Sequence, residues 1–154
     1  MISDSSFSDI HGDISGGVAL LKSITGYIAN SSFMYSSGFG GGALNILNVE
    51  DFVITGCTFS GNDASLSGGA VSITLSEVAI ENCIFAGNSA TEGGAIYSAQ
   101  SVVDMNSCEF FTNSAADRGA AISAIESDFT ILVSMFEGNG AHNEAGIVYA
   151  ISAL

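Results

Sequence analysis

The sequence contains no proline among its 154 residues. Proline cannot donate a backbone hydrogen bond and is confined to the edges and bulges of sheets, so its absence is typical of a protein whose strands lie mostly between other strands. Basic residues are nearly missing as well, because Lys22 and Arg118 stand alone against 16 acidic residues and leave a formal net charge of −14. A phosphate backbone or an anionic membrane needs a basic surface, so nucleic acid and anionic lipid are excluded as partners.

Long apolar runs and metal-binding motifs are also missing. No eighteen consecutive apolar residues occur, although 47% of the residues are hydrophobic, so we expect no membrane insertion by this segment. No Cys-x-x-Cys pair is present, and the only two histidines, His11 and His142, lie near opposite ends of the chain. We therefore predict no metal site and no cofactor.

What the sequence has instead is a repeat. Phenylalanine recurs after 25 or 26 residues, at Phe7, Phe33, Phe59, Phe85, Phe110 and Phe136. A repeat of this length indicates one supersecondary unit per period, and each unit buries its apolar face by stacking on its neighbours. We predict that residues 1–154 form a single repeat domain. We expect neither end to carry a polar cap, so the domain would be a piece of a longer solenoid or a unit that joins other copies.

Two short motifs accompany the phenylalanines. Asparagine follows three residues later in four of the six units, at Asn62, Asn88, Asn113 and Asn139. A small-residue pair, Ala and an aliphatic come next, as GGAL at 41–44, GGAV at 68–71 and GGAI at 93–96. Stacked asparagine amides can pass hydrogen bonds from unit to unit, which predicts a ladder. The alternative is that asparagine is present because it tolerates a left-handed turn conformation.

Apolar residues between these motifs are spaced by two, which is typical of strands. In the third unit they stand at Val71, Ile73, Leu75, Val78, Ile80, Cys83 and Phe85. The step of three from Ile80 to Cys83 predicts a bend near residues 81–82, because an odd step in a straight strand would turn the side chain to the other face. Further bends are expected at residues 87–88 and 91–94.

Three short strands and three turns then fill one unit. We therefore predict an all-β fold, a single-stranded right-handed parallel β-helix of about six coils of 25–27 residues with three short strands per coil. Equivalent side chains would stack roughly 4.8 Å apart along the axis. One inner column would contain Ile28, Ile54, Ile80, Met105 and Ile131, and another Phe52, Val78, Val103 and Phe129.

The cysteines occupy a column of their own, two residues before the phenylalanine. They are Cys57, Cys83 and Cys108. Thiols stacked in a core behave as small hydrophobic groups. A disulfide between adjacent coils is the alternative, but parallel side-chain vectors give poor disulfide geometry and an odd number leaves one thiol over.

One outer column combines both signs of charge. Glu92, Arg118 and Glu144 stand at equivalent positions before the small-residue pair. We predict an ionic ladder through these three residues on the outer surface. Because exposed pairs contribute only about 0–1 kcal/mol each, the ladder would mark the register more than it would stabilise the fold.

The remaining acidity has two interpretations. Self-repulsion keeps an apolar, strand-rich surface from aggregating, so the negative charge favours solubility. Divalent cation binding is the alternative, since Asp51 and Glu77 fall one coil apart. The GGxGxDxUx repeat of calcium-binding β-rolls is not present, so we predict no specific metal site.

The repeated FxxN motif, in phase with GGA followed by Ile, Val or Leu, resembles the repeats of the chlamydial polymorphic outer membrane proteins, over nearly the whole chain. The resemblance implies a right-handed β-helix on a cell surface, with adhesive or structural work. It supplies no catalytic residues to transfer to this sequence.

These observations favour a non-catalytic, extracellular or cell-surface structural module, which associates with itself through open end coils into a fibre or surface layer. The first alternative is an adhesin that binds a host-surface protein or glycan, for which Tyr97 and Tyr149 offer aromatic side chains. The second is an enzyme like the pectate lyases, which share the β-helix and degrade acidic polysaccharides. Two basic residues and a net charge of −14 weigh against it, because a polyanionic substrate would be repelled. We therefore predict no catalytic residues.

Overall fold

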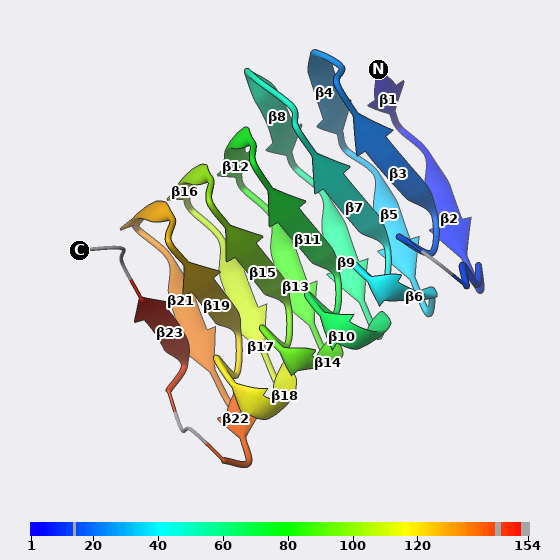
Figure 1. Ribbon diagram of the computed structural model, residues 1–154. Helices are drawn as coiled ribbons and strands as arrows, with labels where there is room; N and C mark the ends of the chain where they lie inside the picture. The colour runs from blue at the N-terminus through cyan, green and yellow to red at the C-terminus, as the bar shows by residue number, and fades with distance from the viewer. Residues whose placement is uncertain (14, 144–145, 152–154) are drawn as a thin grey trace.

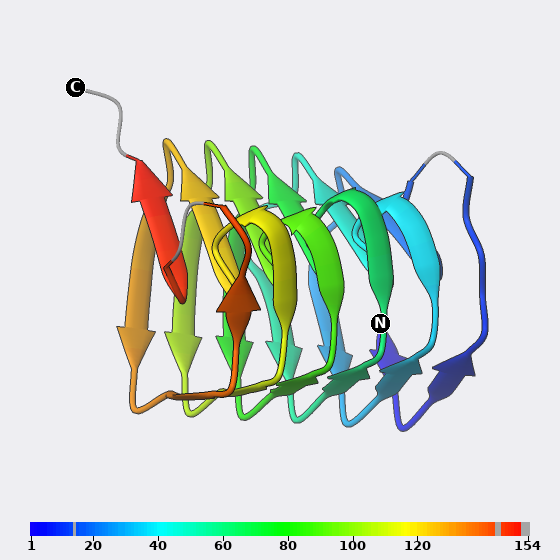
Figure 2. The ribbon, with the colours of Figure 1, turned by 90° about the horizontal axis from the view of Figure 1, so that it is seen from below.

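Successive coils of the chain stack on one another along a single axis (Figure 1). The computed structural model describes residues 1–13, 15–143 and 146–151. Within these residues every strand pair is parallel, and the strands form four sheets that run along the axis, here called sheets A to D. Strands β1 and β23 lie at opposite ends of the stack (Figure 2).

Sheets A, B and D contain six strands each and sheet C contains five, one strand from each coil that contributes to the sheet. Sheet A contains β1 (Ile2–Ser3), β4 (Gly26–Ala29), β8 (Phe52–Thr55), β12 (Glu77–Glu81), β16 (Val102–Asn106) and β20 (Asp128–Leu132). Sheet B contains β2 (Ser6–Ser8), β5 (Ser32–Met34), β9 (Thr58–Ser60), β13 (Ile84–Ala86), β17 (Glu109–Phe111) and β21 (Met135–Glu137). Sheet C contains β6 (Ser37–Gly40), β10 (Asp63–Ser67), β14 (Ser89–Glu92), β18 (Ser114–Arg118) and β22 (Gly140–Ala141). Sheet D contains β3 (Ala19–Lys22), β7 (Leu44–Leu47), β11 (Val71–Thr74), β15 (Ile96–Ala99), β19 (Ile122–Ile125) and β23 (Val148–Ile151).

The predicted fold class is confirmed, but a full coil holds four strands and not three. The strand that the sequence did not predict belongs to sheet C. Its inner side carries small residues, such as Ala64 and Ala90, in place of the large aliphatic residues that mark the other strands. Sheet C also absorbs the differences in coil length, since Asp63 pairs with Ser89 while the later pair is Ser67 with Glu92, a shift of one residue. A fixed period therefore fails to mark this strand.

The corner between sheets D and A was also not predicted from the sequence. Leu75 was predicted to continue the inner apolar series of β11, yet its side chain is 52% exposed and its backbone is left-handed, with φ of 50°. The chain turns there from sheet D to sheet A, and Ser76 becomes the next inward residue. The step of three from Leu75 to Val78 carried the same signal as the step from Ile80 to Cys83.

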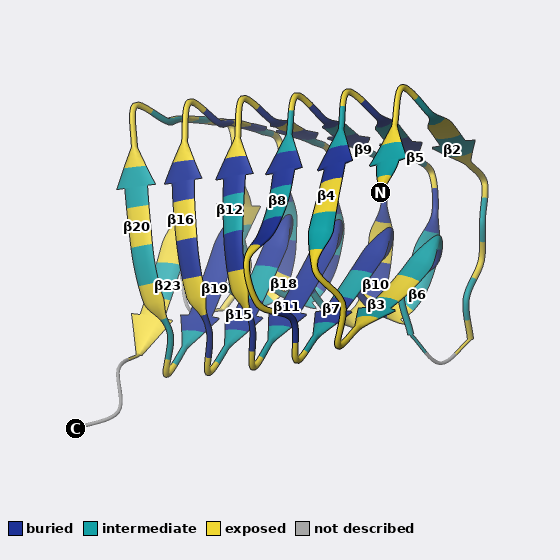
Figure 3. Ribbon diagram, turned by 90° about the horizontal axis from the view of Figure 1, so that it is seen from above, coloured by how far each residue is buried: buried dark blue, intermediate teal, exposed yellow. Residues whose placement is uncertain are grey.

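The core is a set of continuous side-chain columns between the four sheets. The six phenylalanines of sheet B stack with ring centroids 4.7–5.1 Å apart and interplanar angles of at most 12°. In the inner aliphatic columns, Ile80 pairs in register with Ile54 below it and Met105 above it. Burial is most complete in the middle coils (Figure 3), whereas Phe7 and Phe136 in the end coils are only partly buried. Each coil is thus shielded from water by its neighbours, as expected for a solenoid.

Three of the four corners carry a polar ladder. At each of them one residue adopts a left-handed backbone, and the next side chain turns into the core, as in the steps from Leu75 to Ser76 and from Gly87 to Asn88. The inward group hydrogen bonds to backbone of its own or the neighbouring coil. Buried backbone groups that the bends remove from the sheets find partners in this way.

The corner between sheets C and D is built from glycine instead. Gly93 has φ of 63°, and a Cβ atom added to it would lie 2.1 Å from the carbonyl oxygen of Ile96 in the same coil. This corner therefore requires glycine for both its backbone conformation and the close approach of the chain to itself.

Candidate functional site

The asparagines form a buried ladder between sheets B and C. The Asn88 Nδ2 atom donates to the Asn113 Oδ1 atom at 2.9 Å and to the Phe59 carbonyl at 3.1 Å. The Asn88 Oδ1 atom accepts from the backbone N–H and the side-chain Nδ2 of Asn62, each at 3.0 Å. The left-handed residue at this corner is Gly87 and not the asparagine. The ladder, and not tolerance of a turn, is therefore the reason for asparagine at this position.

The cysteines face the core at the corner between sheets A and B. All three are buried and free, with no disulfide among them. The thiol of Cys83 accepts the backbone N–H of Cys57 at 3.4 Å and donates to the carbonyl of Glu81 at 3.2 Å. Hydrogen bonds with the thiols of Cys108 and Cys57, together with burial, raise the pKa of the Cys83 thiol well above its ordinary range. These thiols are structural groups that water does not reach.

Serine plays the same part in other coils. Ser134 accepts the backbone N–H of Cys108 at 3.2 Å and donates to the carbonyl two residues before it, at 2.9 Å. A further serine ladder lies at the corner between sheets D and A. It comprises Ser76, Ser101 and Ser127, and it was not predicted from the sequence. Their spacing of 25 and 26 residues, in phase with the phenylalanines, was the available signal.

One of the two ion pairs in the predicted ladder, that between Glu92 and Arg118, is present. The Arg118 Nη2 atom lies 3.1 Å from the Glu92 Oε1 atom, and the two residues pair in register between β14 and β18. Glu144 lies outside the described residues. Arg118 makes further contacts, because its Nε atom lies 3.4 Å from Asp117 and its guanidinium carbon lies 5.1 Å from the centroid of the Tyr149 ring. One of the two basic residues is therefore held by two carboxylates and an aromatic ring.

The two tyrosines that the sequence offered as candidate binding side chains are not fully exposed. Tyr97 and Tyr149 hold the same position in β15 and β23 with Ser123 of β19 between them, and both are half-buried and not exposed. Tyr149 is covered in part by Arg118. Burial, and then the nearby Glu92 carboxylate, raise the pKa of Tyr97. The more exposed aromatic side chains include Tyr35 and Phe39.

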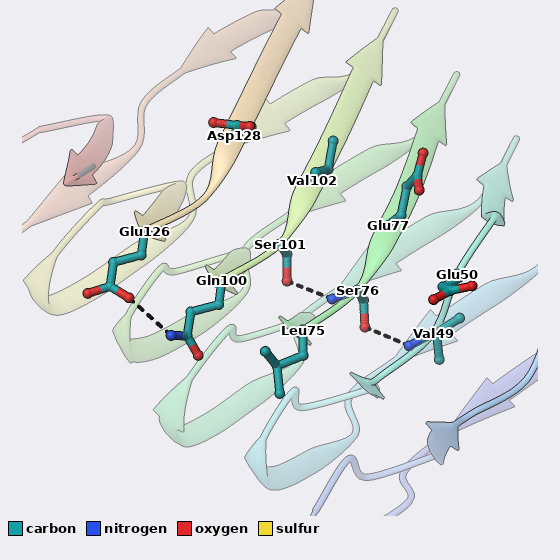
Figure 4. A pocket seen from close by; sticks show the side chains of 10 residues that line it. All are labelled: Val49, Glu50, Leu75, Ser76, Glu77, Gln100, Ser101, Val102, Glu126 and Asp128. Carbon is teal, nitrogen blue, oxygen red and sulfur yellow. Dashed lines mark hydrogen bonds between the residues drawn. The ribbon is translucent and has the colours of Figure 1, made fainter. Parts of the chain in front are cut away.

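A groove of about 540 Å³ follows the corner between sheets D and A (Figure 4). Its charged lining is acidic and consists of Glu50, Glu77, Glu126 and Asp128. The Gln100 Nε2 atom donates to the Glu126 Oε2 atom at 3.1 Å, while the hydroxyls of Ser76 and Ser101 are occupied by backbone groups. Such a surface repels an acidic polysaccharide.

In the part of the chain that the structure describes, no three histidine, cysteine, aspartate or glutamate side chains gather in a way that could hold a metal ion. Asp51 and Glu77 stand one coil apart, as the register of Phe52 with Val78 requires. None of the described segments is a helix long and apolar enough to cross a membrane.

Comparison with known proteins gives one match. The model of the family described as "Right handed beta helix region" matches residues 1–153, nearly the whole chain. None of the curated proteins and none of the solved structures matches.

Proposed function

This chain belongs to the right-handed β-helix family, and we propose that it is a non-catalytic structural module that stacks end to end with further copies of itself outside the cell. The proposal rests on one observation, which is that every coil packs on the next coil in the same way. Each coil pairs with the next in parallel and in register, with the same aromatic, aliphatic and amide columns continuing across the junction. A surface built in this way is complementary to a copy of itself displaced along the axis.

The two ends of the described stretch supply that surface. Strands β20, β21, β22 and β23 form one edge of the four sheets, and β1, β2, β3 and β6 form the other. Phe136 and Phe129 at one end and Phe7 at the other are partly buried members of the inner columns. Docking one edge on the other is a heterologous contact that does not close on itself, so it would produce a filament.

The proposal is tested by sedimentation velocity and electron microscopy of the purified chain over a range of concentrations. We expect end-to-end particles whose length grows with concentration and whose width remains that of one solenoid. Monodisperse monomers at every concentration would remove the assembly proposal.

A matched pair of variants locates the contact. Phe136→Lys places a charge at the end of the phenylalanine column and should suppress the polymers, because a docked coil would bury that charge. Leu132→Lys makes the same change of charge at an exposed position of β20, where its side chain points away from the core, and should leave assembly intact. Equal effects of the two substitutions would show that charge alone, and not column stacking, controls assembly.

The extracellular setting rests on the likeness of the FxxN and GGA[ILV] repeats to those of the chlamydial polymorphic outer membrane proteins. Antibody labelling of intact and of permeabilised source cells tests it. We expect labelling without permeabilisation, and signal only after permeabilisation would overturn the placement.

An adhesive role is the second candidate. It is favoured by a specific feature of the outer surface, namely a groove beside Tyr97 in which polar side chains converge.

A further inference from the structure

A groove of about 350 Å³ lies where sheets C and D meet, across three successive coils. Tyr97 and Glu92 line it from the upper coil, Phe39 from the lower coil, and Leu66 and Ser72 from the coil between them. Its volume falls at the lower end of the range of about 300–1,000 Å³ that is usual for small-molecule sites.

Three polar atoms from three strands converge on the floor of this groove. A Cβ atom added to Gly40 would lie 3.4 Å from the Ser67 Oγ atom, 3.8 Å from the Asn45 Nδ2 atom and 3.9 Å from the Ser72 Oγ atom. The missing side chain of Gly40 therefore leaves a small space that a hydroxyl, an amide and a second hydroxyl surround.

These groups are free to bind a ligand. Ser72 is only 5% exposed as a whole residue, but its hydroxyl is not one of the fully buried atoms without a partner, which among the described residues are Arg118 Nε and Ser123 Oγ, so it is open to the groove that it lines. The side chains of Asn45 and Ser67 line the same groove beside it.

The walls of the groove are apolar. Phe39 and Leu66 are 51% and 45% exposed, and Tyr97 stands at the upper end. An aromatic face beside clustered hydroxyl and amide groups suits a sugar ring, which presents C–H groups on its faces and hydroxyls around its edge.

Charge decides which sugars fit. Glu92 is the charged residue that lines the groove, and one of its oxygens already lies 3.1 Å from Arg118. An acidic sugar would meet this carboxylate and the net charge of −14, so its binding is disfavoured. A purely apolar ligand would leave the three polar groups of the floor without partners.

We propose that this groove binds the neutral pyranose units of a glycan. Asn45, Ser67 and Ser72 hydrogen bond to the sugar hydroxyls above Gly40, and Tyr97 and Phe39 pack against the ring. The site extends the adhesive candidate, and it does not require end-to-end assembly.

The closing experiment is a titration with lactose, cellobiose and maltose followed by saturation-transfer NMR, together with an array of neutral and acidic glycans. We expect binding of at least one neutral glycan and weaker binding of its acidic counterparts. Asn45→Ala should weaken it about tenfold, the ratio that corresponds to one lost hydrogen bond of about 1.4 kcal/mol.

Gly40→Ala gives a sharper test. Its backbone is not left-handed and the added methyl group meets no atom closer than 3.4 Å, so the variant should fold while filling the floor of the groove and abolishing binding. Gly140→Ala, where an added Cβ atom meets nothing within 4 Å, is the matched control and should bind as the unchanged chain does.

Three results would overturn the proposal: no neutral glycan bound at millimolar concentration, stronger binding of acidic glycans, or binding that Gly40→Ala leaves intact. Sedimentation of the same samples keeps this outcome separate from that of the assembly proposal. A chain that polymerises without binding sugar refutes only the site, and a monomer that binds sugar refutes only the assembly.

Discussion

At the scale of single residues, each of the three polar corners depends on one inward polar group that serves two coils. The side-chain oxygen of Asn88 accepts two hydrogen bonds from Asn62, and its amide nitrogen donates a hydrogen bond to the carbonyl oxygen of Phe59. Removal of this side chain leaves buried donors and an acceptor without partners, which costs more than the hydrogen bonds themselves contribute.

We therefore expect Asn88→Ala to lower the free energy of unfolding by about 3–5 kcal/mol. Asn106→Ala, at an exposed position of β16, should change it by no more than about 0.5 kcal/mol. Urea denaturation followed by circular dichroism measures both values. A cost for Asn88→Ala as small as that of the control would show that the ladder does not stabilise the fold.

The cysteine column makes a second prediction at this scale. Serine stands at the equivalent position in other coils and makes the same two hydrogen bonds, so Cys83→Ser should retain the acceptor for the N–H of Cys57. Cys83→Ala removes that acceptor and should be less stable than Cys83→Ser by about 1 kcal/mol. Denaturation of the two variants side by side gives the difference, and equal stability would contradict a role for this hydrogen bond.

At the scale of the element, the four corners differ in how strictly they require glycine. Gly87 and Gly93 have the same left-handed φ of 63°. An added Cβ atom at Gly87 meets nothing within 4 Å, and Thr112 takes the equivalent position one coil above with φ of 52°. At Gly93 the same atom would lie 2.1 Å from the backbone of its own coil.

Alanine substitutions at these two glycines distinguish the cost of a strained backbone from the cost of steric overlap. Gly87→Ala should cost about 1–2 kcal/mol, the cost of a left-handed alanine. Gly93→Ala should cost at least about 3 kcal/mol, because the corner must also open to admit the methyl group. Thermal unfolding of both variants by calorimetry checks the order, and a smaller loss at Gly93 would show that the corner yields easily.

At the scale of the whole molecule, the apolar columns and the net charge act in opposition. The columns continue to both ends of the described stretch and favour stacking of copies, whereas a net charge of −14 on each copy opposes it. The balance depends on ionic strength, since the screening length falls from about 10 Å at 0.1 M salt to about 3 Å at 1 M.

Added sodium chloride should therefore lengthen the proposed polymers and raise the melting temperature of the monomer. Light scattering and calorimetry over a salt series measure the two effects. Sodium sulfate at matched ionic strength is the control, because an effect of ion type would differ between the salts and screening would not. Polymers that shorten as salt rises would mean that charged contacts, and not the columns, hold the copies together.

Much of this architecture could be predicted because the repeat places equivalent residues above one another. The period of Phe59, Phe85 and Phe110, and the spacing of two in β11 and β12, were sufficient for the fold class and for the bends at Asn82 and Gly87. The strands of sheet C were not predicted, since their inward residues are alanines and their length varies from coil to coil. The bend at Leu75 was missed although its odd spacing was visible.

The sequence by itself determined the coil, its register and its inner columns, because these follow from a period that any reader of the chain can count. Only the tertiary structure decided the groove above Gly40. Asn45 and Ser72 pair in register in sheet D, but Ser67 belongs to sheet C and meets them only because the chain turns at the glycine corner between sheets C and D. A period specifies which residues stack along the axis, whereas the angles of the corners decide which residues face one another across it.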